Sequence, residues 1–416
     1  MELKGRNFYY VLTTISLLWV AFLYFALDVS AQTFIFPDSD NYREAASFLY
    51  HDLKSHPYRP LVMSAITGIP YLFGLGDSAV YTFSFFVNVI SWLGSSLLLF
   101  SLIKNILPER KAFYFTLVFF TLVGCAFIVF HLLTEALFTF CMLLTFYLIN
   151  KWYHTKTFRY LAFAIAVLLA SVLIKPGAKY LSIIAILFFI KPLFKHALKP
   201  SALIIYAFGM LIYIQCAMVK KDYGDFTISY IDNVTLYNYI GTRAFLYSKG
   251  ETFTKYENPR MPYLFSLSYH EAKKVAQADV KEQLKNNKIN LVKAYFTNLW
   301  NNITTNSTSL NVFSNVYNKS YYQFLRRGML LTSRIQNLFF SVSGFLLAIL
   351  YLFKSYKTSP FYSIISFYIL YTLLISGVSC FEGDRFTIIF FPAVLLLMAK
   401  FYSERSKTHQ KHTKHV

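Results

Sequence analysis

Two carboxylates stand close together in the first polar stretch of the chain, in the run Pro37-Asp38-Ser39-Asp40-Asn41-Tyr42. Acids at positions i and i+2 of a turn can converge on a divalent cation such as Mg²⁺ or Mn²⁺, or one acid can act as a base beside the other. Aspartate is also common at helix N-caps, so either acid could instead cap the amphipathic helix that follows. The spacing alone leaves the catalytic and the capping interpretations open.

A basic residue follows in the same stretch, at Tyr58-Arg59-Pro60. Its guanidinium can hold a phosphate through two parallel hydrogen bonds, or it can snorkel from the membrane interface to lipid headgroups. Further ionisable residues stand at the ends of apolar segments, where charge is costly and often marks function. They are His131, Glu135, Lys175, Lys179, Glu382, Asp384 and Arg385.

The elements that position these residues are predicted to be membrane helices. Hydrophobic residues make up 56% of the chain and charged residues 14%, against about 25% charged in a soluble domain. Lysine and arginine lie in short tracts between apolar runs, so the net charge of +20 does not indicate a nucleic-acid partner. The four cysteines match neither a disulfide framework nor a zinc site.

The apolar runs predict an all-α polytopic membrane protein with about ten transmembrane helices, amphipathic helices in the first outer loop and a small extracytoplasmic subdomain. The first run, about 20 residues long, exceeds the apolar core of a signal peptide and is predicted to be retained. The predicted transmembrane helices cover residues 8–27, 79–103, 112–149 (a tight hairpin of two), 160–174, 178–190, 201–219, 336–353, 360–377 and 385–400.

These helices divide the chain into four parts. An N-terminal transmembrane part, 1–219, includes the first outer loop, 28–58, and a C-terminal transmembrane part covers 336–400. Between them lies a polar region, 220–335, with helical patterns over about 270–286 and 289–300, and a basic tail covers 401–416.

Basic residues determine the predicted orientation. Lysines and arginines cluster in alternate loops, on the same side as the N-terminus and the tail, and the positive-inside rule places that side in the cytoplasm. The acidic first loop and all the ionisable residues named above then share the outer face. Together they predict one cavity suited to a substrate with a phosphate and a hydroxyl group. The basic loop residues are Lys104, Arg110, Lys111, Lys151, Lys156, Arg159, Lys191, Lys195, Lys199, Lys354 and Lys357.

These motifs resemble those of the GT-C superfamily of integral membrane glycosyltransferases. The closest group is the bacterial relatives of dolichyl-phosphate-mannose protein mannosyltransferases and of the aminoarabinose transferase that modifies lipid A. The first-loop run resembles the family pattern in which an Asp is followed four residues later by a Tyr, with an Arg-Pro step beyond. Lys175 stands where an Arg is usual and Phe386 where a Tyr is common, so a phosphate contact at Lys175 would be less directional. The other matching stretches are His131-Leu132-Leu133-Thr134-Glu135, Ile174-Lys175-Pro176 and Asp384-Arg385-Phe386.

The resemblance implies an inverting transfer of a sugar from a polyprenyl-phosphate donor to a hydroxyl group of a lipid, glycan or protein acceptor. The reaction would take place on the outer face of the bacterial inner membrane, among membrane lipids, with both termini in the cytoplasm. Asp38 and Asp40 are the candidate catalytic residues and also the candidate ligands of a divalent cation. The candidate substrate- and phosphate-binding residues are Tyr42, Arg59, His131, Glu135, Lys175, Lys179 and Arg385.

Two other functions stay open. A surface-polysaccharide polymerase or ligase would share the topology and the donor. A carrier or flippase of polyprenyl-linked sugars would need charged residues along a path through the membrane, and the predicted helices at 79–103, 201–219, 336–353 and 360–377 carry almost none in their interiors.

Overall fold

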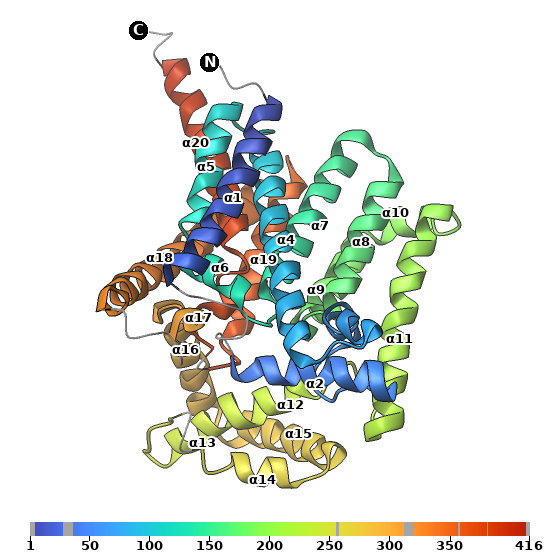
Figure 1. Cartoon of the computed structure of the whole chain (residues 1–416). Helices are drawn as coiled ribbons and strands as arrows, with labels where there is room; N and C mark the ends of the chain where they lie inside the picture. The colour runs from blue at the N-terminus through green and yellow to red at the C-terminus, as the bar shows by residue number, and fades with distance from the viewer. Residues whose placement is uncertain are drawn as a thin grey trace.

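The computed structural model describes residues 5–27, 36–254, 258–311, 320–356, 358–380 and 382–412. Within these residues the protein is all-helical and contains no strand, which confirms the predicted all-α class. Long helices stand side by side in one bundle, and shorter helices form a layer across one end of it (Figure 1). Both chain termini lie at the opposite end of the bundle.

Several helices have the length and composition of membrane spans. Because a span needs about 20 apolar residues, five described helices qualify, and the pair Glu109–Phe120 and Val123–Phe130 forms a further apolar unit bent by 70°. Three shorter helices are also apolar: α8 (Phe158–Val172), α9 (Lys179–Phe188, preceded by η3, Pro176–Ala178) and α19 (Pro360–Ser376). The five long ones are α1 (Gly5–Leu27), α4 (Asp77–Ile103), α7 (Glu135–Thr155), α11 (Leu203–Tyr223) and α18 (Ser320–Lys354).

The tight hairpin predicted within 112–149 is wrong. Helix α5 (Glu109–Phe120) is followed by the short α6 (Val123–Phe127) and η2 (Ile128–Phe130) before α7 begins. The side chain of Gln336 in α18 bridges the break, because its Oε1 accepts from the Val123 N–H at 3.0 Å and its Nε2 donates to the Thr121 carbonyl at 2.8 Å. Local sequence could not reveal a partner so distant along the chain.

The boundaries of the last helices also differ from the prediction. Helix α18 begins at Ser320 rather than 336, and Arg334 within it donates from Nε to the Thr304 carbonyl at 2.9 Å. A short turn, η6 (Gly383–Phe386), precedes α20 (Phe391–His412), which continues into the predicted tail. Arginine and lysine are good helix formers, so polar sequence did not end either helix.

The segment between α1 and α4 contains α2 (Pro37–Asp52), α3 (Leu61–Thr67) and η1 (Ile69–Phe73). Phe36 occupies the N-cap position of α2 and no side chain caps this end, so neither Asp38 nor Asp40 has the capping role left open by the sequence. Both acids lie in the first turn, where a negative charge interacts favourably with the helix dipole.

The layer at the end of the bundle consists of the helices from α12 to α17 (Figure 1). The two patterns predicted at 270–286 and 289–300 are confirmed as its longest helices, and a capping box between Ser268 and Glu271 begins the first of them. The layer contains α12 (Ile231–Val234), η5 (Thr235–Gly241), α13 (Thr242–Ser248), α14 (Met261–Ser266), α15 (Tyr269–Asn286), α16 (Lys288–Thr304) and α17 (Thr308–Asn311). The helices α10 (Ile190–Lys195) and η4 (Pro200–Ala202) join α9 to α11.

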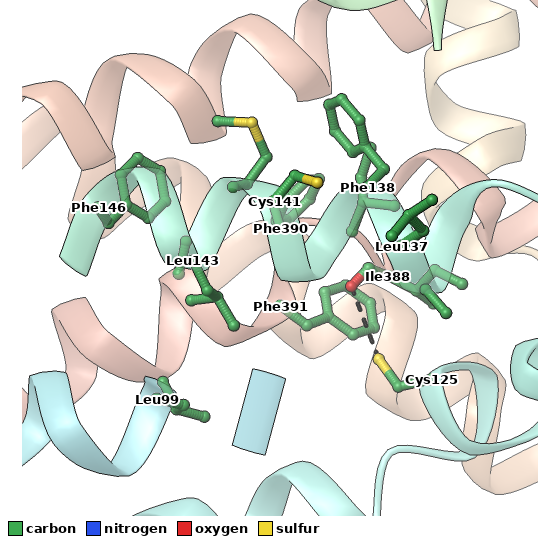
Figure 2. Close-up of a cluster of buried hydrophobic side chains, with 14 of the residues drawn as sticks. Leu99, Cys125, Leu137, Phe138, Cys141, Leu143, Phe146, Ile388, Phe390 and Phe391 are labelled. Carbon is green, nitrogen blue, oxygen red and sulfur yellow. Dashed lines mark hydrogen bonds between the residues drawn. The ribbon is translucent and has the colours of Figure 1, made fainter. Parts of the chain in front are cut away.

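The core packs α7 against the segment that joins η6 to α20 (Figure 2). The buried cluster includes Phe138 and Leu143 of α7 together with Ile388 and Phe390 (Figure 2), and the Cys125 thiol donates to the Ile388 carbonyl at 3.6 Å. All four cysteines are buried without a disulfide bond, as small apolar residues. This packing fixes η6, and therefore Arg385, beside the start of α7.

Candidate functional site

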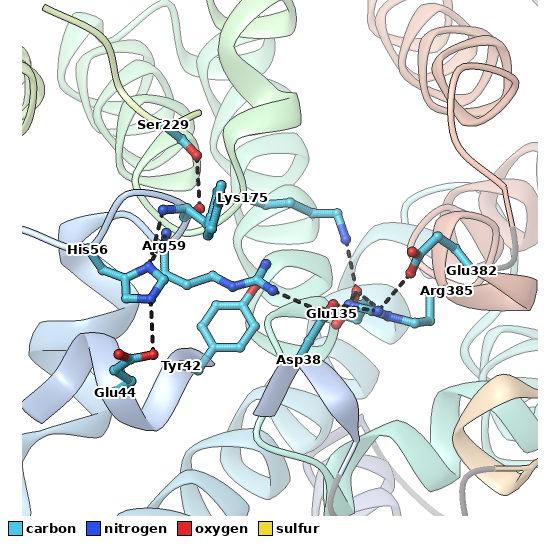
Figure 3. Close-up of polar contacts among 11 residues, drawn as sticks. Asp38, Tyr42, Glu44, His56, Arg59, Glu135, Lys175, Ser229, Glu382 and Arg385 are labelled. Atoms are coloured by element: carbon cyan, nitrogen blue, oxygen red, sulfur yellow. Dashed lines mark hydrogen bonds and ion pairs between the residues drawn. The ribbon is translucent and has the colours of Figure 1, made fainter. Parts of the chain in front are cut away.

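Asp38 lies between two arginines that come from distant parts of the chain (Figure 3). Its Oδ1 is 2.9 Å from Nη2 of Arg59, which follows α2, and its Oδ2 accepts from Nη1 of Arg385, in η6, at 2.9 Å. Both arginines are buried, whereas the Asp38 side chain is 30% exposed. Asp38 is therefore more accessible than either of the two buried arginines that it contacts.

Arg385 connects three carboxylates. Besides Asp38, its Nη1 donates to Glu382 at 2.8 Å, and its Nε and Nη2 contact Oε1 of Glu135 at 3.1 and 3.0 Å. The guanidinium also stacks over Phe36, 4.5 Å from the ring centroid. A planar group with five donors is suited to holding several acids at once, which a lysine ammonium could not do with the same geometry.

Glu135 begins α7 and is almost completely buried. Its Oε1 accepts from Lys175 Nζ at 2.9 Å in addition to the contacts with Arg385. Lys175 is held in extended backbone just before the Pro176 turn, so the break predicted at this position is what brings the lysine to the site. The group therefore contains three cations, Arg59, Lys175 and Arg385, and three carboxylates, Asp38, Glu135 and Glu382.

The loop after α2 fixes Arg59. Its guanidinium stacks over Tyr42, 4.4 Å from the ring centroid, and its Nη1 donates to the Tyr42 hydroxyl at 3.5 Å. His56 Nδ1 accepts from the backbone N–H groups of Tyr58 and Arg59, both at 3.1 Å. Ser229 donates to the Tyr58 carbonyl at 2.9 Å, so the segment between α11 and α12 also supports the loop.

The charges of the site favour an ionised Asp38 and a neutral His56. Burial by itself would raise the pKa of Asp38, but the charges of Arg385 and Arg59 outweigh it and hold that pKa well below its usual range. Burial, assisted by the charge of Arg59, lowers the pKa of His56 to about 3. With Nδ1 accepting two hydrogen bonds, the histidine proton is on Nε2, facing Glu44 at 3.6 Å.

A cavity of about 350 Å³ opens beside these charges, within the range of small-molecule sites, about 300–1,000 Å³. One end of it carries Asp38, Tyr42, Arg59, Lys175, Glu382 and Arg385. Most of the remaining wall is apolar or aromatic, and includes Phe138, Tyr180, Leu181, Leu236, Tyr239, Tyr368, Tyr371, Ile375, Phe386 and Ile389. The cavity therefore suits an amphiphile with a charged head and an apolar body.

Four predicted site residues do not line this cavity. One of them, Glu135, is next to it, because it contacts the lining residues Lys175 and Arg385. Asp40 accepts from the Tyr81 hydroxyl at 2.6 Å and its side chain is 63% exposed. His131 is buried, with Nε2 3.0 Å from the Ser309 carbonyl and its ring edge-on to Phe36, the residue under Arg385. Lys179 pairs with Asp232 at 3.1 Å. The aspartate lines the cavity, whereas Lys179 does not.

The predicted cation pair of Asp38 and Asp40 does not fit the geometry. The two carboxylates bind different partners, and both oxygens of Asp38 are engaged by arginines. Within the described parts of the chain, no three His, Cys, Asp or Glu side chains gather where they could hold a metal ion.

Sequence reasoning missed the aromatic wall of the cavity. Tyr180, Tyr239, Tyr368 and Tyr371 come from three separate elements, and the chain contains 33 tyrosines, so no local pattern marks these four.

Asp384, grouped by sequence with the outer-face acids, is instead buried beside the site. Its Oδ1 accepts from the Thr308 N–H at 3.0 Å, and burial raises the pKa of its carboxyl to about 7.

Comparisons with protein-family models, with curated proteins and with solved structures found no match for this chain. The resemblance to the GT-C superfamily therefore depends only on the motif residues and on the chemistry of the site that several of them form.

Proposed function

We propose that this protein is a membrane glycosyltransferase that moves a sugar from a polyprenyl-phosphate donor to an acceptor hydroxyl group. The observation that carries the proposal is the Asp38 carboxylate, held by Arg59 and Arg385 at the polar end of a largely apolar cavity. The phosphate of the donor matches the guanidinium groups, and its polyprenyl tail matches the apolar wall.

Binding of the donor would change the state of Asp38. A carboxylate held by two arginines is a weak base, because its ionised form is strongly stabilised. A phosphate that takes over the hydrogen bonds of Arg59 and Arg385 would release this carboxylate and raise its pKa. Arg59 and Arg385 would thus pair with Asp38 in the free protein and with the phosphate once the donor is bound.

The transfer itself then needs few groups. The acceptor oxygen attacks the anomeric carbon of the sugar, the bond from this carbon to the phosphate oxygen breaks, and Asp38 takes the proton of the acceptor hydroxyl. The polyprenyl phosphate leaves as an anion, stabilised by Arg59, Arg385 and Lys175. Attack from the side opposite the phosphate inverts the anomeric centre.

The same proposal includes ten crossings of the bacterial inner membrane, with both termini in the cytoplasm and region 220–335 outside. The five long helices, the bent pair, the three shorter apolar helices and the apolar start of α20 supply ten candidates. The termini lie at one end of the bundle, and α2 and the end layer lie at the other (Figure 1). This arrangement supports an outer location of the site.

The decisive experiment measures transfer from a panel of radiolabelled polyprenyl-phosphate sugars added outside sealed, right-side-out vesicles, with a total membrane extract as the acceptor. We expect the wild type to label one acceptor class and Asp38→Asn to lose at least about 100-fold of this rate, because the base is absent. Asp52→Asn, at the exposed end of the same helix, serves as the matched control and should transfer at the wild-type rate.

Each alternative outcome has a distinct meaning. Wild-type turnover by a well-folded Asp38→Asn variant would contradict the role of the carboxylate. Asp38→Glu keeps an acid at this position, and a partial recovery of transfer would separate loss of the base from loss of folding. A ladder of lengthening products would favour the polymerase function, and transport of the donor without transfer would favour the carrier.

A further inference from the structure

The end layer contributes an unusual helical turn to the cavity. Residues Thr235–Gly241 form η5, a π-helical turn between α12 and α13. Such turns have i→i+5 hydrogen bonds, are rare and occur frequently at functional sites. Three residues of this turn line the cavity: Thr235, Leu236 and Tyr239. They lie outside every motif described above.

Side chains of neighbouring elements stabilise the wide turn. The Thr242 hydroxyl donates to the Tyr237 carbonyl, five residues earlier, at 2.9 Å. The side-chain amides of Asn258 and Gln283 donate to the carbonyls of Asn238 at 2.7 Å and Gly241 at 3.4 Å. These bonds satisfy carbonyl groups within the turn, so the geometry is specified by the surrounding residues rather than by a local irregularity.

Gly241 makes the close packing of this turn possible. A Cβ atom at this position would meet Asp279 Oδ2 and the Leu236 carbonyl oxygen, each at 2.6 Å. Asp279 is itself held by Arg260, with Nη2 2.5 Å from Oδ1. Since these neighbours are fixed, only glycine fits without a displacement, and the π turn is an integral part of the layer.

The wide turn directs Tyr239 toward the cavity. In an α-helix, four residues exceed one turn of about 3.6 residues, so side chains at i, i+4 and i+8 drift around the axis. A wider turn offsets this drift. Ile231, Thr235 and Tyr239, each four residues apart, accordingly all line the same cavity.

The surroundings of Tyr239 keep its phenol protonated. Burial, followed by the negative charges of Glu382 and Asp38, raises the pKa of Tyr239, against a smaller opposing effect of Arg385. The side chain is partly buried and belongs to the same cavity wall as these three charged residues. The cavity wall that contains Arg59 and Arg385 therefore also holds a neutral hydrogen-bond donor.

We propose that the Tyr239 hydroxyl donates a hydrogen bond to the phosphate of the bound polyprenyl phosphate, which makes this tyrosine a substrate-binding residue. The inference rests on the proposed function, because it takes the same ligand class and the same cavity. Arg59, Lys175 and Arg385 are each already paired with a carboxylate. A neutral donor has no such competing partner charge, and its hydrogen bond to an anion is roughly twice as strong as one between neutral groups.

The test uses the full-length protein in lipid nanodiscs and two probes, farnesyl phosphate and farnesol, whose binding is measured for each variant. Tyr239→Phe keeps the ring and removes only the hydroxyl. We expect it to bind farnesyl phosphate about tenfold more weakly than the wild type and to bind farnesol equally well. Tyr263→Phe, a half-exposed tyrosine of α14, is the control and should bind both probes like the wild type.

Two results would overturn the inference. One is wild-type affinity of Tyr239→Phe for farnesyl phosphate. The other is an equal loss of affinity for farnesyl phosphate and farnesol, which would assign the hydroxyl to packing. The proposed function would fail separately if the wild type bound farnesyl phosphate but transferred no sugar in the vesicle assay. In that case, a selective loss of farnesyl phosphate binding in Tyr239→Phe would still support the contact between the Tyr239 hydroxyl and the phosphate.

Discussion

Two faces of helix α2 carry the same kinds of residue in very different surroundings. On one face, Asp38 and Tyr42 meet Arg59 and line the cavity. On the other face, Asp40 pairs with Arg43 at 3.9 Å and accepts from a tyrosine of α4. The Arg59 side chain is 9% exposed and that of Arg43 is 31% exposed. Both faces thus combine an acid, an arginine and a tyrosine, and differ chiefly in their access to water.

The comparison shows that burial, rather than residue type, decides which set can do chemistry. An ion pair in contact with water is screened and contributes about 0–1 kcal/mol. Charges removed from water interact far more strongly, and a ligand that rearranges them changes the pKa of each one. On the proposed function the Asp38 face would respond to a bound phosphate, whereas the Asp40 face attaches α2 to α4.

The largest difference should appear when an arginine that pairs with an acid of each face is replaced by lysine: Arg385 for Asp38, or Arg43 for Asp40. Arg385→Lys cannot hold Asp38, Glu135 and Glu382 together, because an ammonium lacks the planar fork. We expect transfer to fall by about 100-fold or more, together with a lower thermal midpoint of the detergent-solubilised protein. Arg43→Lys should stay within about threefold of the wild type. Equal effects of the two substitutions would contradict the division of α2 into a reactive and an attaching face.

A smaller effect should appear as a pH dependence of stability at the Arg59 loop. The usual pKa of histidine is near 6.5, and burial, assisted by the charge of Arg59, lowers the pKa of His56 to about 3 in the folded protein. As the pH falls below 6.5, the unfolded state gains a proton that the folded state does not accept, so stability decreases until about pH 3. The loss should approach about 2 kcal/mol at pH 5, measured as a fall in the thermal midpoint between pH 7 and pH 5.

The matched variant for this pH effect is His56→Asn. Asparagine can accept hydrogen bonds from backbone N–H groups two and three residues later without titrating. The variant should retain transfer at pH 7 and show a smaller fall of the thermal midpoint at pH 5. An unchanged pH dependence would show that another group is responsible.

The smallest effect is expected for Asp40→Asn. Its side chain is exposed and outside the cavity, so transfer should change by less than about threefold, as for the loss of a surface ion pair. The measurement is the vesicle assay with and without added Mg²⁺ or Mn²⁺. A loss as large as that of Asp38→Asn, together with a requirement for the cation, would restore the two-carboxylate metal site that the sequence predicted.

The sequence predicted the helical class and most helices well, because apolar runs and polar breaks are local signals. It also placed Asp38, Arg59, Glu135, Lys175 and Arg385 in one group, and the structure joins all five through direct contacts. Spacing along the chain could not separate Asp38 from Asp40, because successive residues of a helix face different directions and the partner of each acid lies elsewhere.

Other features depended on contacts between distant segments. Gln336 of α18 bridges the break between α5 and α6. His131 packs edge-on against Phe36 and does not line the cavity, which no helix pattern could show. The π turn that carries Tyr239 depends on side chains of Asn258 and Gln283. A single sequence contains these residues but not the pairings among them.

The link between α16 and α19 has a consequence for how the protein is made. Asn298 donates to the carbonyl of Gly377 at 3.1 Å, and Asn302 donates to those of Ser376 and Ser379 at 2.8 and 3.1 Å. The final carbonyls of a helix lack partners within it. Asn302 precedes Ser376 by 74 residues. The ribosome therefore synthesises the asparagine donors of α16 before the carbonyl acceptors at the end of α19. When α19 forms, the side chains that complete its end have already been synthesised.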